Sequence, residues 1–314
     1  MKSISFGGFE AGFVDALRQS AFEHNVNVNS PGMADIHLHL NPDHKKIAVN
    51  PDTVIALIAE PKIVRPDMYR PRIMKKFLEC LTISRVRAEK LGLENVMELP
   101  IKPPSIFHTD AKRDRKICLV AGHKFSASRL SNYGLRRKVL RSKFGGLIDL
   151  YGPDWFDPFW LELQRRVFAA RLQFWSPTEF SIKEFLGDFG KSYTNYRGIM
   201  DADFRMMNRY ELSLVVENQS DYISEKIWIS LARGAVPIYV GPALNEFNEE
   251  LADAVFQVEA KPEAILEVLN NASPAEIELK RSAGFSVLES NWMTSRNDEN
   301  VARKFIRYFK EKYG

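Results

Sequence analysis

Two glutamates, an asparagine and a lysine stand close together in the stretch VVENQSDYISEKIWI. An apolar run ends immediately before Glu217 and Asn218, and Glu225 and Lys226 follow after six further residues. A lysine at a helix start can bind phosphate together with free backbone N–H groups, and a carboxylate can accept hydrogen bonds from two neighbouring hydroxyls of a ribose. These residue types suit a phosphorylated sugar ligand. The alternative is an ordinary solvated first turn of a helix.

The surrounding pattern predicts one βαβ unit that would position these side chains. LSLVV, residues 212–216, is a predicted buried strand, and Ser220 or Asp221 suits the N-cap of the helix after it. That helix carries one apolar stripe and ends at Gly234, after which AVPIYVG is the next predicted strand. The candidate residues then lie at the strand's C-terminal end and in the first two helical turns, which is the ligand-binding edge of a parallel sheet.

Length and composition bound the class of protein. The chain has 314 residues, 45% hydrophobic and 27% charged, as expected for a globular protein of two ordinary domains. No run approaches the roughly 18 apolar residues of a membrane span, and MKSISFGGFEAGF lacks the order of a secretory signal, so we expect a cytoplasmic protein. Cys80 and Cys118 lack metal-ligand spacing and are expected to be inert buried thiols.

Short apolar runs alternate with helical patterns, which predicts α/β domains with parallel sheets. SISFGGF, IHLHL and TVIALIAE are predicted strands of a first domain, and MKKFLECLTISRVRAEKLG is predicted as a helix followed by mixed structure. The proline-rich LPIKPPSIFHTDAKRDR is the predicted linker, and KICLVAG, LIDLYG, ELSLVVE and AVPIYVG supply strands of a second domain. We therefore expect domains at residues 1–110 and 111–290, followed by a basic amphipathic helix in residues 291–314.

Positive charge is concentrated in one segment. Residues 111–150 hold eleven Lys or Arg and two Asp, a net charge of +9, whereas the rest of the chain carries −5. An anionic ligand is expected near this segment. No zinc-finger or stacking-aromatic signature accompanies it, so a small phosphorylated ligand is favoured over nucleic acid.

The string YELSLVVENQSDYISEKIWISLARGAVPIYVG resembles the signature of the α-1,3-fucosyltransferase family, glycosyltransferase family 10, of bacterial type. The shared features are a strand, Glu-Asn, a short loop, Tyr-x-x-Glu-Lys and a strand that contains proline. The family's Tyr-x-Gly corresponds to Tyr196-Arg197-Gly198, and SNYGLRRKVL and LIDLYGPDW resemble the opening helix and second strand of its donor domain. The resemblance extends over roughly 115–245 and is weak elsewhere.

This resemblance implies an α/β fold with two doubly wound Rossmann-like domains facing a cleft, the glycosyltransferase B type. It also implies transfer of fucose from GDP-fucose, with inversion, to a hydroxyl of a glycan acceptor. The donor-binding residues of the family correspond to Arg136, Asn218, Tyr222, Glu225 and Lys226.

The position of the diphosphate-binding arginine has an alternative. Arg136 lies inside the +9 segment, as a diphosphate requires. Arg137, Lys138 and Arg141 are its neighbours, however, so these side chains could instead form a solvated helix face, and the alignment could shift by one residue.

Inverting transfer needs a base that removes the proton of the acceptor hydroxyl. TVIALIAEPK places Glu60 at the end of a predicted strand of the first domain, and the family's base follows an equivalent strand. Glu60 is therefore the predicted catalytic base, with Asp67 and Glu79 as other first-domain carboxylates. A glutamate that closes a strand can equally be a solvated terminus.

A metal site is not expected. His37, His39 and His44 in IHLHLNPDH could suit a metal by type, but strand alternation alone places His37 and His39 on one half-exposed face. The fold implied by the resemblance stabilises the leaving diphosphate with basic side chains and a helix end. No metal or other cofactor is therefore predicted to be essential.

The C-terminal ENVARKFIRYFKEKYG places apolar side chains on one helical stripe with Arg and Lys around it. Such a helix can close the fold by packing on the first domain, which is the favoured interpretation, or contact anionic lipid at the inner face of the cytoplasmic membrane. A lipid-linked glycan acceptor would suit the second interpretation. Two other functions remain open: transfer from a different nucleotide sugar by the same fold, and a nucleotide-sugar or glycan-binding protein without catalysis.

Overall fold

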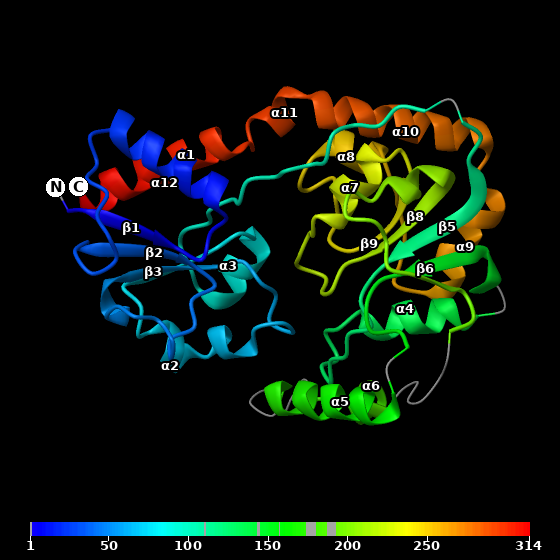
Figure 1. Ribbon diagram of the computed structural model, residues 1–314, viewed down its shortest axis with the longest axis horizontal. Helices are drawn as coiled ribbons and strands as arrows, with labels where there is room; N and C mark the ends of the chain where they lie inside the picture. Colours follow the sequence, from blue (N-terminus) through cyan, green and yellow to red (C-terminus); the bar gives the residue numbers. More distant parts are fainter. Residues whose placement is uncertain (1, 110, 143–144, 157, 174–179, 187–192) are drawn as a thin grey trace. The chain divides into compact units, whose positions relative to one another are not determined.

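The computed structural model describes residues 2–314 apart from 110, 143–144, 157, 174–179 and 187–192 (Figure 1). The chain divides into two compact units: unit 1 comprises Met1–Ile101 and Asn291–Gly314, and unit 2 comprises Lys102–Ser290. Residues 102–109, expected in the first domain, thus belong to unit 2, and residue 110 at the expected boundary lies outside the described residues. The segment is held there because Ser105 O accepts from Arg233 Nη1 at 2.8 Å and Phe107 N–H donates to Ala232 O at 3.0 Å.

Unit 1 contains a parallel four-stranded sheet in the order β1-β2-β3-β4, with strands Ile4–Gly7, Ile36–Leu40, Val54–Ile58 and Glu79–Thr82. A parallel bridge between Ile4 and Val28 places the segment after α1 on the side of β1 opposite to β2. The order of strands therefore reverses at β1. Its other elements are α1 (Ala11–Glu23), η1 (Pro51–Thr53), η2 (Pro66–Tyr69), α2 (Pro71–Met74), α3 (Arg85–Leu91), α11 (Asn291–Thr294) and α12 (Asp298–Tyr313).

The two faces of this sheet are covered by different parts of the chain. On one face, side chains of all four strands pack with α1 and α12, whose Phe305 and Phe309 are buried. On the other face, Val54, Ala56 and Ile58 of β3 pack with Met68 of η2 and with the α2 region. The strand β3 is consequently buried along its whole length, as the uninterrupted apolar run VIALI predicts.

Unit 2 contains a parallel six-stranded sheet in the order β10-β9-β8-β5-β6-β7. Its strands are β5 (Asp114–Val120), β6 (Ile148–Tyr151), β7 (Tyr196–Gly198), β8 (Tyr210–Val216), β9 (Val236–Val240) and β10 (Phe256–Gln257). Its helices are α4 (Tyr133–Leu140), η3 (Gly145–Leu147), α5 (Phe159–Gln173), α6 (Ile182–Leu186), η5 (Arg205–Arg209), α7 (Lys226–Ala232), α8 (Glu249–Asp253), α9 (Pro262–Asn271) and α10 (Pro274–Glu289).

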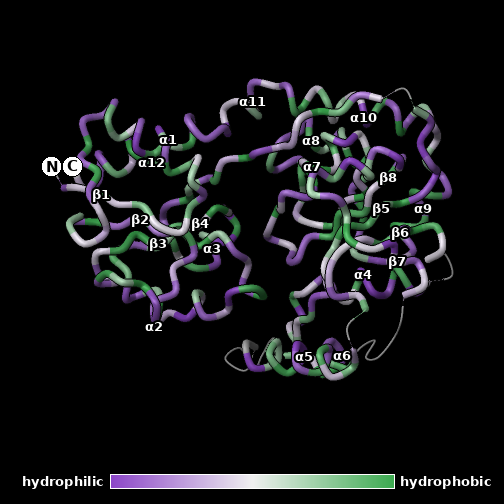
Figure 2. The backbone as a smooth tube through the Cα atoms, in the orientation of Figure 1, coloured by the Kyte–Doolittle hydropathy of each residue, from purple (hydrophilic) through white to green (hydrophobic). Residues whose placement is uncertain are grey.

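The order of strands in unit 2 is that of a dinucleotide-binding sheet. The chain moves outward from β5 to β6 and β7, then returns to place β8 on the other side of β5. Ligands of such sheets bind at the C-terminal ends of the two strands where the order reverses. Figure 2 shows hydrophobic residues along β5, β8 and β9, which form the buried centre of this unit.

Most predicted strands are present, and two local predictions are wrong. The stretch from Met74 does not form the predicted helix: α2 ends at Met74, and β4 follows because Phe77 and Leu81 pack into the cores of opposite faces. The helix of the central motif begins at Lys226 and not near Ser220. The short strands β7 and β10 were not predicted from the sequence.

Candidate functional site

Two loops meet where the strand order of unit 2 reverses. One follows β5 and leads to α4, and the other follows β8 and leads to α7. Asn132 joins them: its side-chain amide donates to Glu217 O at 3.1 Å, and its backbone N–H donates to Asn218 O at 3.1 Å. The residues predicted to bind the donor phosphates all lie on these loops or on the first turns of these helices, so the fold brings them to one edge of one sheet.

Glu217 explains why α7 starts late. Its side chain is 1% exposed, and its Oε1 accepts a hydrogen bond from the Ser224 backbone N–H at 2.9 Å. Burial raises the pKa of this carboxyl, against the opposing effect of the hydrogen bonds from Ser224. The carboxyl therefore closes the loop from 217 to 224 on itself, and the backbone of that loop cannot join the helix.

Arg136 is buried at the end of β8. Its guanidinium donates to Val216 O and, at 3.0 Å, to Asn218 Oδ1, and its side chain is 4% exposed. Burial lowers the pKa of the guanidinium, while the nearby Tyr133, Glu217 and Glu225 oppose that lowering. Arg136 and Asn218 are thus direct neighbours.

The interpretation of these four basic side chains as a solvated helix face is wrong for two of them. Arg136 and Arg137 are both buried, whereas Lys138 and Arg141 are exposed. Helical periodicity produces this split, because Arg136 points to the end of β8 and Arg137 to the loop after β5, while Lys138 turns to solvent.

Glu225 and Lys226 stand at the start of α7, with Glu225 as its N-cap residue. The Lys226 Nζ lies 3.0 Å from Glu225 Oε1, and their side chains are 28% and 64% exposed. Partial desolvation would raise the pKa of Glu225, but the Lys226 ammonium outweighs it and lowers that pKa. An exposed carboxylate and an ammonium beside a helix start can still contact a ligand, and the half-buried Tyr222 lies in the same loop.

Lys124 is a further cation near this site that the sequence interpretation missed. It is exposed in the loop after β5, and its charge adds to the lowering of the Glu225 pKa. Its backbone is held because Lys124 O accepts from Arg137 Nη1 at 3.2 Å. The available signal was a lysine two residues beyond the predicted strand KICLVAG, at the ligand edge of the sheet.

Glu60 lies in unit 1, two residues after β3, and is half-buried. Its backbone is held from three directions: Asn41 Oδ1 accepts its N–H at 3.1 Å, and its carbonyl accepts from Tyr69 OH at 2.7 Å and from Arg87 Nη1 at 3.3 Å. Among the described residues the structure records no hydrogen bond to its carboxylate. The main chain is therefore fixed while the side chain stays available.

The two other first-domain carboxylates have structural partners. Asp67 forms an ion pair with Arg65 at 3.0 Å. Glu79 accepts from Lys312 Nζ at 2.6 Å, from Tyr313 OH at 2.6 Å and from Tyr308 OH. Burial would raise the pKa of Glu79, but these hydrogen bonds outweigh it and lower the pKa. Glu79 thus anchors the C-terminal helix.

The described residues His37, His39 and His44 are not grouped so that they could hold a metal ion. The prediction that His37 is half-exposed is wrong: it is 3% exposed, and its Nδ1 lies 2.6 Å from Ser5 Oγ, because β1 and β3 flank β2 on both sides. Across the described part of the chain, no three His, Cys, Asp or Glu side chains are grouped so that they could hold a metal ion.

The pair Asp201 and Asp203 has the spacing of carboxylates that can share a cation, and the structure assigns both to other contacts. Asp201 caps η5 by accepting from the backbone N–H groups of Arg205 at 2.8 Å and Met206 at 3.2 Å. Asp203 pairs with Arg205 at 2.9 Å. Both lie before β8, away from the edge that carries Lys226.

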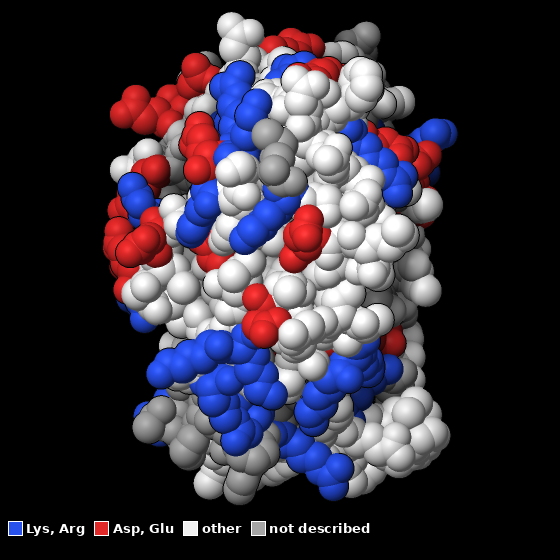
Figure 3. Space-filling model, turned by 90° about the vertical axis from the view of Figure 1, so that its left-hand side faces the viewer, with Lys and Arg blue, Asp and Glu red and all other residues white. Residues whose placement is uncertain are grey.

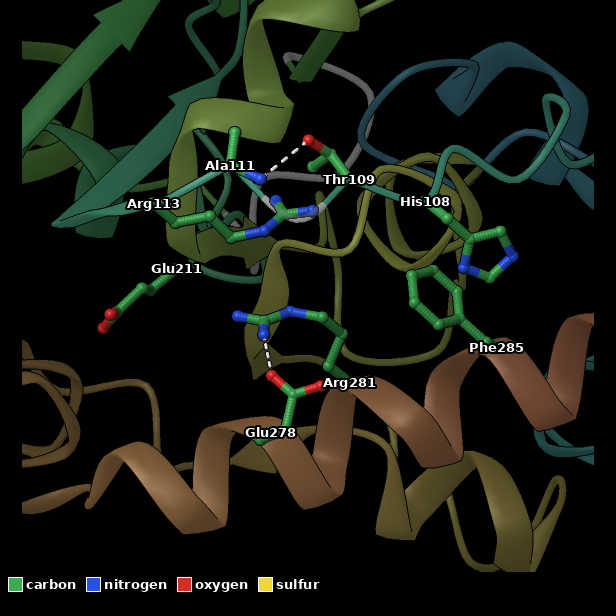
Figure 4. Close-up of a pocket in the computed structure, with 8 residues that line it drawn as sticks. All are labelled: His108, Thr109, Ala111, Arg113, Glu211, Glu278, Arg281 and Phe285. Carbon is green, nitrogen blue, oxygen red and sulfur yellow. Dashed lines mark hydrogen bonds and ion pairs between the residues drawn. The ribbon is translucent and has the colours of Figure 1, made fainter.

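A cavity of about 420 Å³ lies at the opposite edge of the unit 2 sheet (Figure 4). Its basic side chains serve the scaffold: Arg113 Nη1 donates to Tyr210 O and Arg233 O, and Arg281 Nε donates to Gly234 O. The cavity is lined by His108, Thr109, Ala111, Arg113, Glu211, Glu278, Arg281 and Phe285. It is therefore separate from the candidate donor site.

The C-terminal helix α12 packs within unit 1. Val301, Phe305 and Phe309 of its apolar stripe are buried against the face that also holds α1. The stripe is occupied by this packing, as in the favoured interpretation, and is not presented to lipid. Within the described residues, no helix combines the length and the apolar character needed to cross a membrane.

Comparisons with known proteins agree with this architecture. No family model matches the chain. A stretch of 70 residues is 34% identical to α-(1,3)-fucosyltransferase B of Drosophila melanogaster, and it covers 21% of this chain and 16% of that protein's length. The HepE protein of Anabaena, solved in complex with UDP and glucose, superposes with a TM-score of 0.53 at 8% identity over 99% of this chain and all of that one.

An α-glucosyltransferase solved in complex with UDP and a 13-mer DNA gives a TM-score of 0.52 at 8% identity, again over 99% of this chain and all of that one. At these identities the likeness establishes the fold alone. The chain therefore has the α/β glycosyltransferase B fold with two Rossmann-like units, as the family resemblance implied.

Proposed function

We propose that this protein is an inverting glycosyltransferase that moves fucose from GDP-fucose to a hydroxyl of a glycan acceptor, in an α-1,3 linkage. The observation that carries the proposal is the placement of Glu225 and Lys226 at the start of α7, beside the point where the strand order of a Rossmann sheet reverses. The stretch similar to a Drosophila α-1,3-fucosyltransferase supports the choice of fucose.

The donor site is built from charges of unit 2. Lys226 and the start of α7 bind the diphosphate, and Glu225 accepts hydrogen bonds from the ribose hydroxyls. Arg136 adds positive potential from its buried position and holds Asn218, while Tyr222 in the connecting loop contacts the donor. These cations stabilise the charge that develops on the leaving GDP, so the proposed reaction requires no divalent metal.

The acceptor proton is removed by Glu60. As the hydroxyl oxygen attacks the anomeric carbon, the bond from that carbon to the diphosphate breaks, the configuration inverts, and the carboxylate takes the proton. The reaction requires Glu60 of unit 1 and the donor residues of unit 2 to reach the same pair of substrates. The fixed backbone of Glu60 favours this role because it limits the directions in which the carboxylate can point.

Transfer from a sugar donor that carries another nucleotide is the second candidate. The two solved structures of the same fold with TM-scores above 0.5 described above contain UDP. A protein that binds nucleotide sugars without catalysis is the remaining alternative, and the carboxylate of Glu60, which forms no hydrogen bond within the described residues, argues against it.

The first experiment measures thermal unfolding with GDP, UDP and CMP, followed by release of nucleotide from the corresponding sugars. A ligand at 100 times its Kd stabilises the folded protein by about 2.7 kcal/mol, which raises the Tm by a few degrees. We expect a shift with GDP and none with UDP. Equal shifts with both would overturn the assignment to GDP-fucose, and GDP binding without turnover would favour the non-catalytic alternative.

A further inference from the structure

One face of unit 1 carries exposed lysines from two segments of the chain. Lys45 and Lys46 precede a segment whose Ile47 and Val49 pack on the same core as α2, and Lys75 and Lys76 follow α2 directly. All four side chains are exposed. We call these four lysines the α2 surface. Figure 3 shows Lys and Arg side chains gathered on the lower part of the face that it presents.

The two pairs lie close enough to act on a common neighbour. Desolvation lowers the pKa of His44, and the charges of Lys76 and Lys45 lower it further, against the opposite effect of Asp43 and Asp67. The core that joins Ile47 and Val49 to Ile73 and Phe77 gives the same placement from packing. The lysines therefore form one positive field and not two separate ones.

Acidic side chains of unit 1 neutralise little of this positive charge. Lys46 lies 3.7 Å from Asp43 with its side chain 85% exposed, which is a weak, solvated pair. For the side-chain ammonium groups of Lys45, Lys75 and Lys76, the part of the chain that the structure describes records no ion pair, although the Lys45 backbone N–H donates to Asp43 Oδ1 at 3.0 Å. The nearby Asp67 is already held by Arg65 at 3.0 Å.

The cations of α12 differ in this respect. Lys304 pairs with Glu98 at 2.9 Å, Lys312 pairs with Glu79 at 2.6 Å, and Lys310 donates to His24 O at 3.1 Å. Lys304, Lys310 and Lys312 are thus used inside the unit, while Arg307 of the same helix is exposed. The four lysines of the α2 surface lie on the face that α2 covers.

We propose that the α2 surface binds the headgroups of an anionic lipid bilayer. The ammonium groups are exposed and come from separate segments, so they form an open field and not a pocket for a small anion. Each lysine near an anionic membrane contributes to attraction that falls off within a Debye length. The adjacent Leu78, 42% exposed, supplies an apolar side chain that can enter the interface.

A nucleic acid fits this surface less well. The exposed Arg72 of α2 adds a guanidinium to the four lysines, which suits phosphate in either ligand. Single-stranded nucleic acid also needs exposed aromatic platforms. The nearby aromatic side chains, Tyr69 and Phe77, are half-buried and buried, respectively.

Sedimentation with vesicles tests the proposal in the absence of any sugar nucleotide, so its outcome does not depend on the donor. The probes are vesicles of phosphatidylcholine alone and of phosphatidylcholine with 30% phosphatidylglycerol. We expect binding only to the anionic vesicles, weakening steeply with salt. Replacing Lys45, Lys46, Lys75 and Lys76 with Glu should weaken binding at least about 100-fold, since each lysine contributes roughly fivefold.

The matched control replaces Lys90, Lys112, Lys138 and Lys183 with Glu, which changes net charge equally at exposed positions elsewhere. This variant should bind anionic vesicles within about fivefold of the wild type, and thermal unfolding checks that both variants fold. Equal losses in the two variants would show that net charge alone matters and would overturn the proposal. Retained binding in the first variant, or displacement of the vesicles by single-stranded RNA at lower concentration, would overturn it too.

Discussion

Glu60 and Glu217 both follow a central strand of a parallel sheet, one in each unit, and the protein uses them in opposite ways. At Glu60 the backbone is held by Asn41, Tyr69 and Arg87, and the half-buried carboxylate has no recorded hydrogen bond or ion pair among the described residues. At Glu217 the carboxyl itself is 1% exposed and accepts the Ser224 N–H.

The difference separates a residue that can do chemistry from one that shapes a loop. A carboxylate that removes a proton must be reachable by substrate and must point in a defined direction, which a fixed backbone supplies. A buried and hydrogen-bonded carboxyl cannot meet a substrate without breaking the loop that it closes. Position at the end of a strand is therefore insufficient to assign a role.

The largest expected effect comes from Glu60→Gln. The amide keeps the shape of the side chain but cannot take a proton, so turnover should fall about 10²- to 10⁴-fold while GDP affinity persists. The measurement is kcat together with the Kd for GDP on folded protein. Glu89→Gln, an exposed carboxylate of α3 in the same unit, is the matched control and should leave turnover unchanged.

Either of two results would contradict the proposed role of Glu60 as the catalytic base. Turnover close to wild type would mean that this carboxylate is a solvated strand terminus. Loss of GDP binding together with activity would place Glu60 in the donor site or in the folding of unit 1, and not in proton transfer.

Lys226→Ala tests whether the loop that Glu217 closes positions a residue that binds the donor. If this loop presents Lys226 to the diphosphate, the loss of one charge-assisted contact of about 1.5–3 kcal/mol should weaken GDP binding about 10- to 100-fold. Lys138→Ala removes an exposed charge of α4 and should have little effect. Calorimetric titration of both variants with GDP decides the point: equal losses would mean that the basic segment acts only as a diffuse field.

Substitution of Glu217 should change the free energy of unfolding more than it changes turnover. Glu217→Ala leaves the buried Ser224 N–H without an acceptor and should cost about 1–3 kcal/mol in the free energy of unfolding. Glu217→Gln keeps an acceptor oxygen and should cost less. Urea unfolding of the two variants measures the difference, and an Ala variant as stable as the Gln variant would show that the carboxyl does not hold the loop.

The smallest expected effect is a change in pH dependence. Burial raises the pKa of Glu217 in the folded protein, so its contribution to stability is complete below the unfolded pKa of about 4.3 and is lost as pH rises through the folded value. Glutamine does not ionise, so the Glu217→Gln variant does not lose this stability as pH rises. The difference in unfolding free energy between variant and wild type should therefore shift in favour of the variant as pH rises above about 4. A difference that stays constant from pH 4 to pH 8 would show that the carboxyl titrates normally.

The amino-acid sequence by itself determined the class of fold, the strands β5, β8 and β9 and the edge at which the donor residues gather. Each of these strands has a largely apolar, buried centre, and such a run that is covered on both faces leaves little choice of structure. The polar residues that follow them must then lie at the C-terminal ends of the strands. Lys226 and Asn218 could be placed from the sequence for this reason.

Only the tertiary structure decided which neighbouring side chains are buried and what they contact. Arg136 and Lys138 share one helical run, yet Arg136 reaches Val216 O while Lys138 is exposed. The basic helix α12 could have met lipid, but its apolar stripe packs on unit 1 and Glu79 binds its end. These outcomes depend on partners distant in sequence, such as Glu79 and Tyr308, which are 229 positions apart, and the local pattern contains no information about such partners.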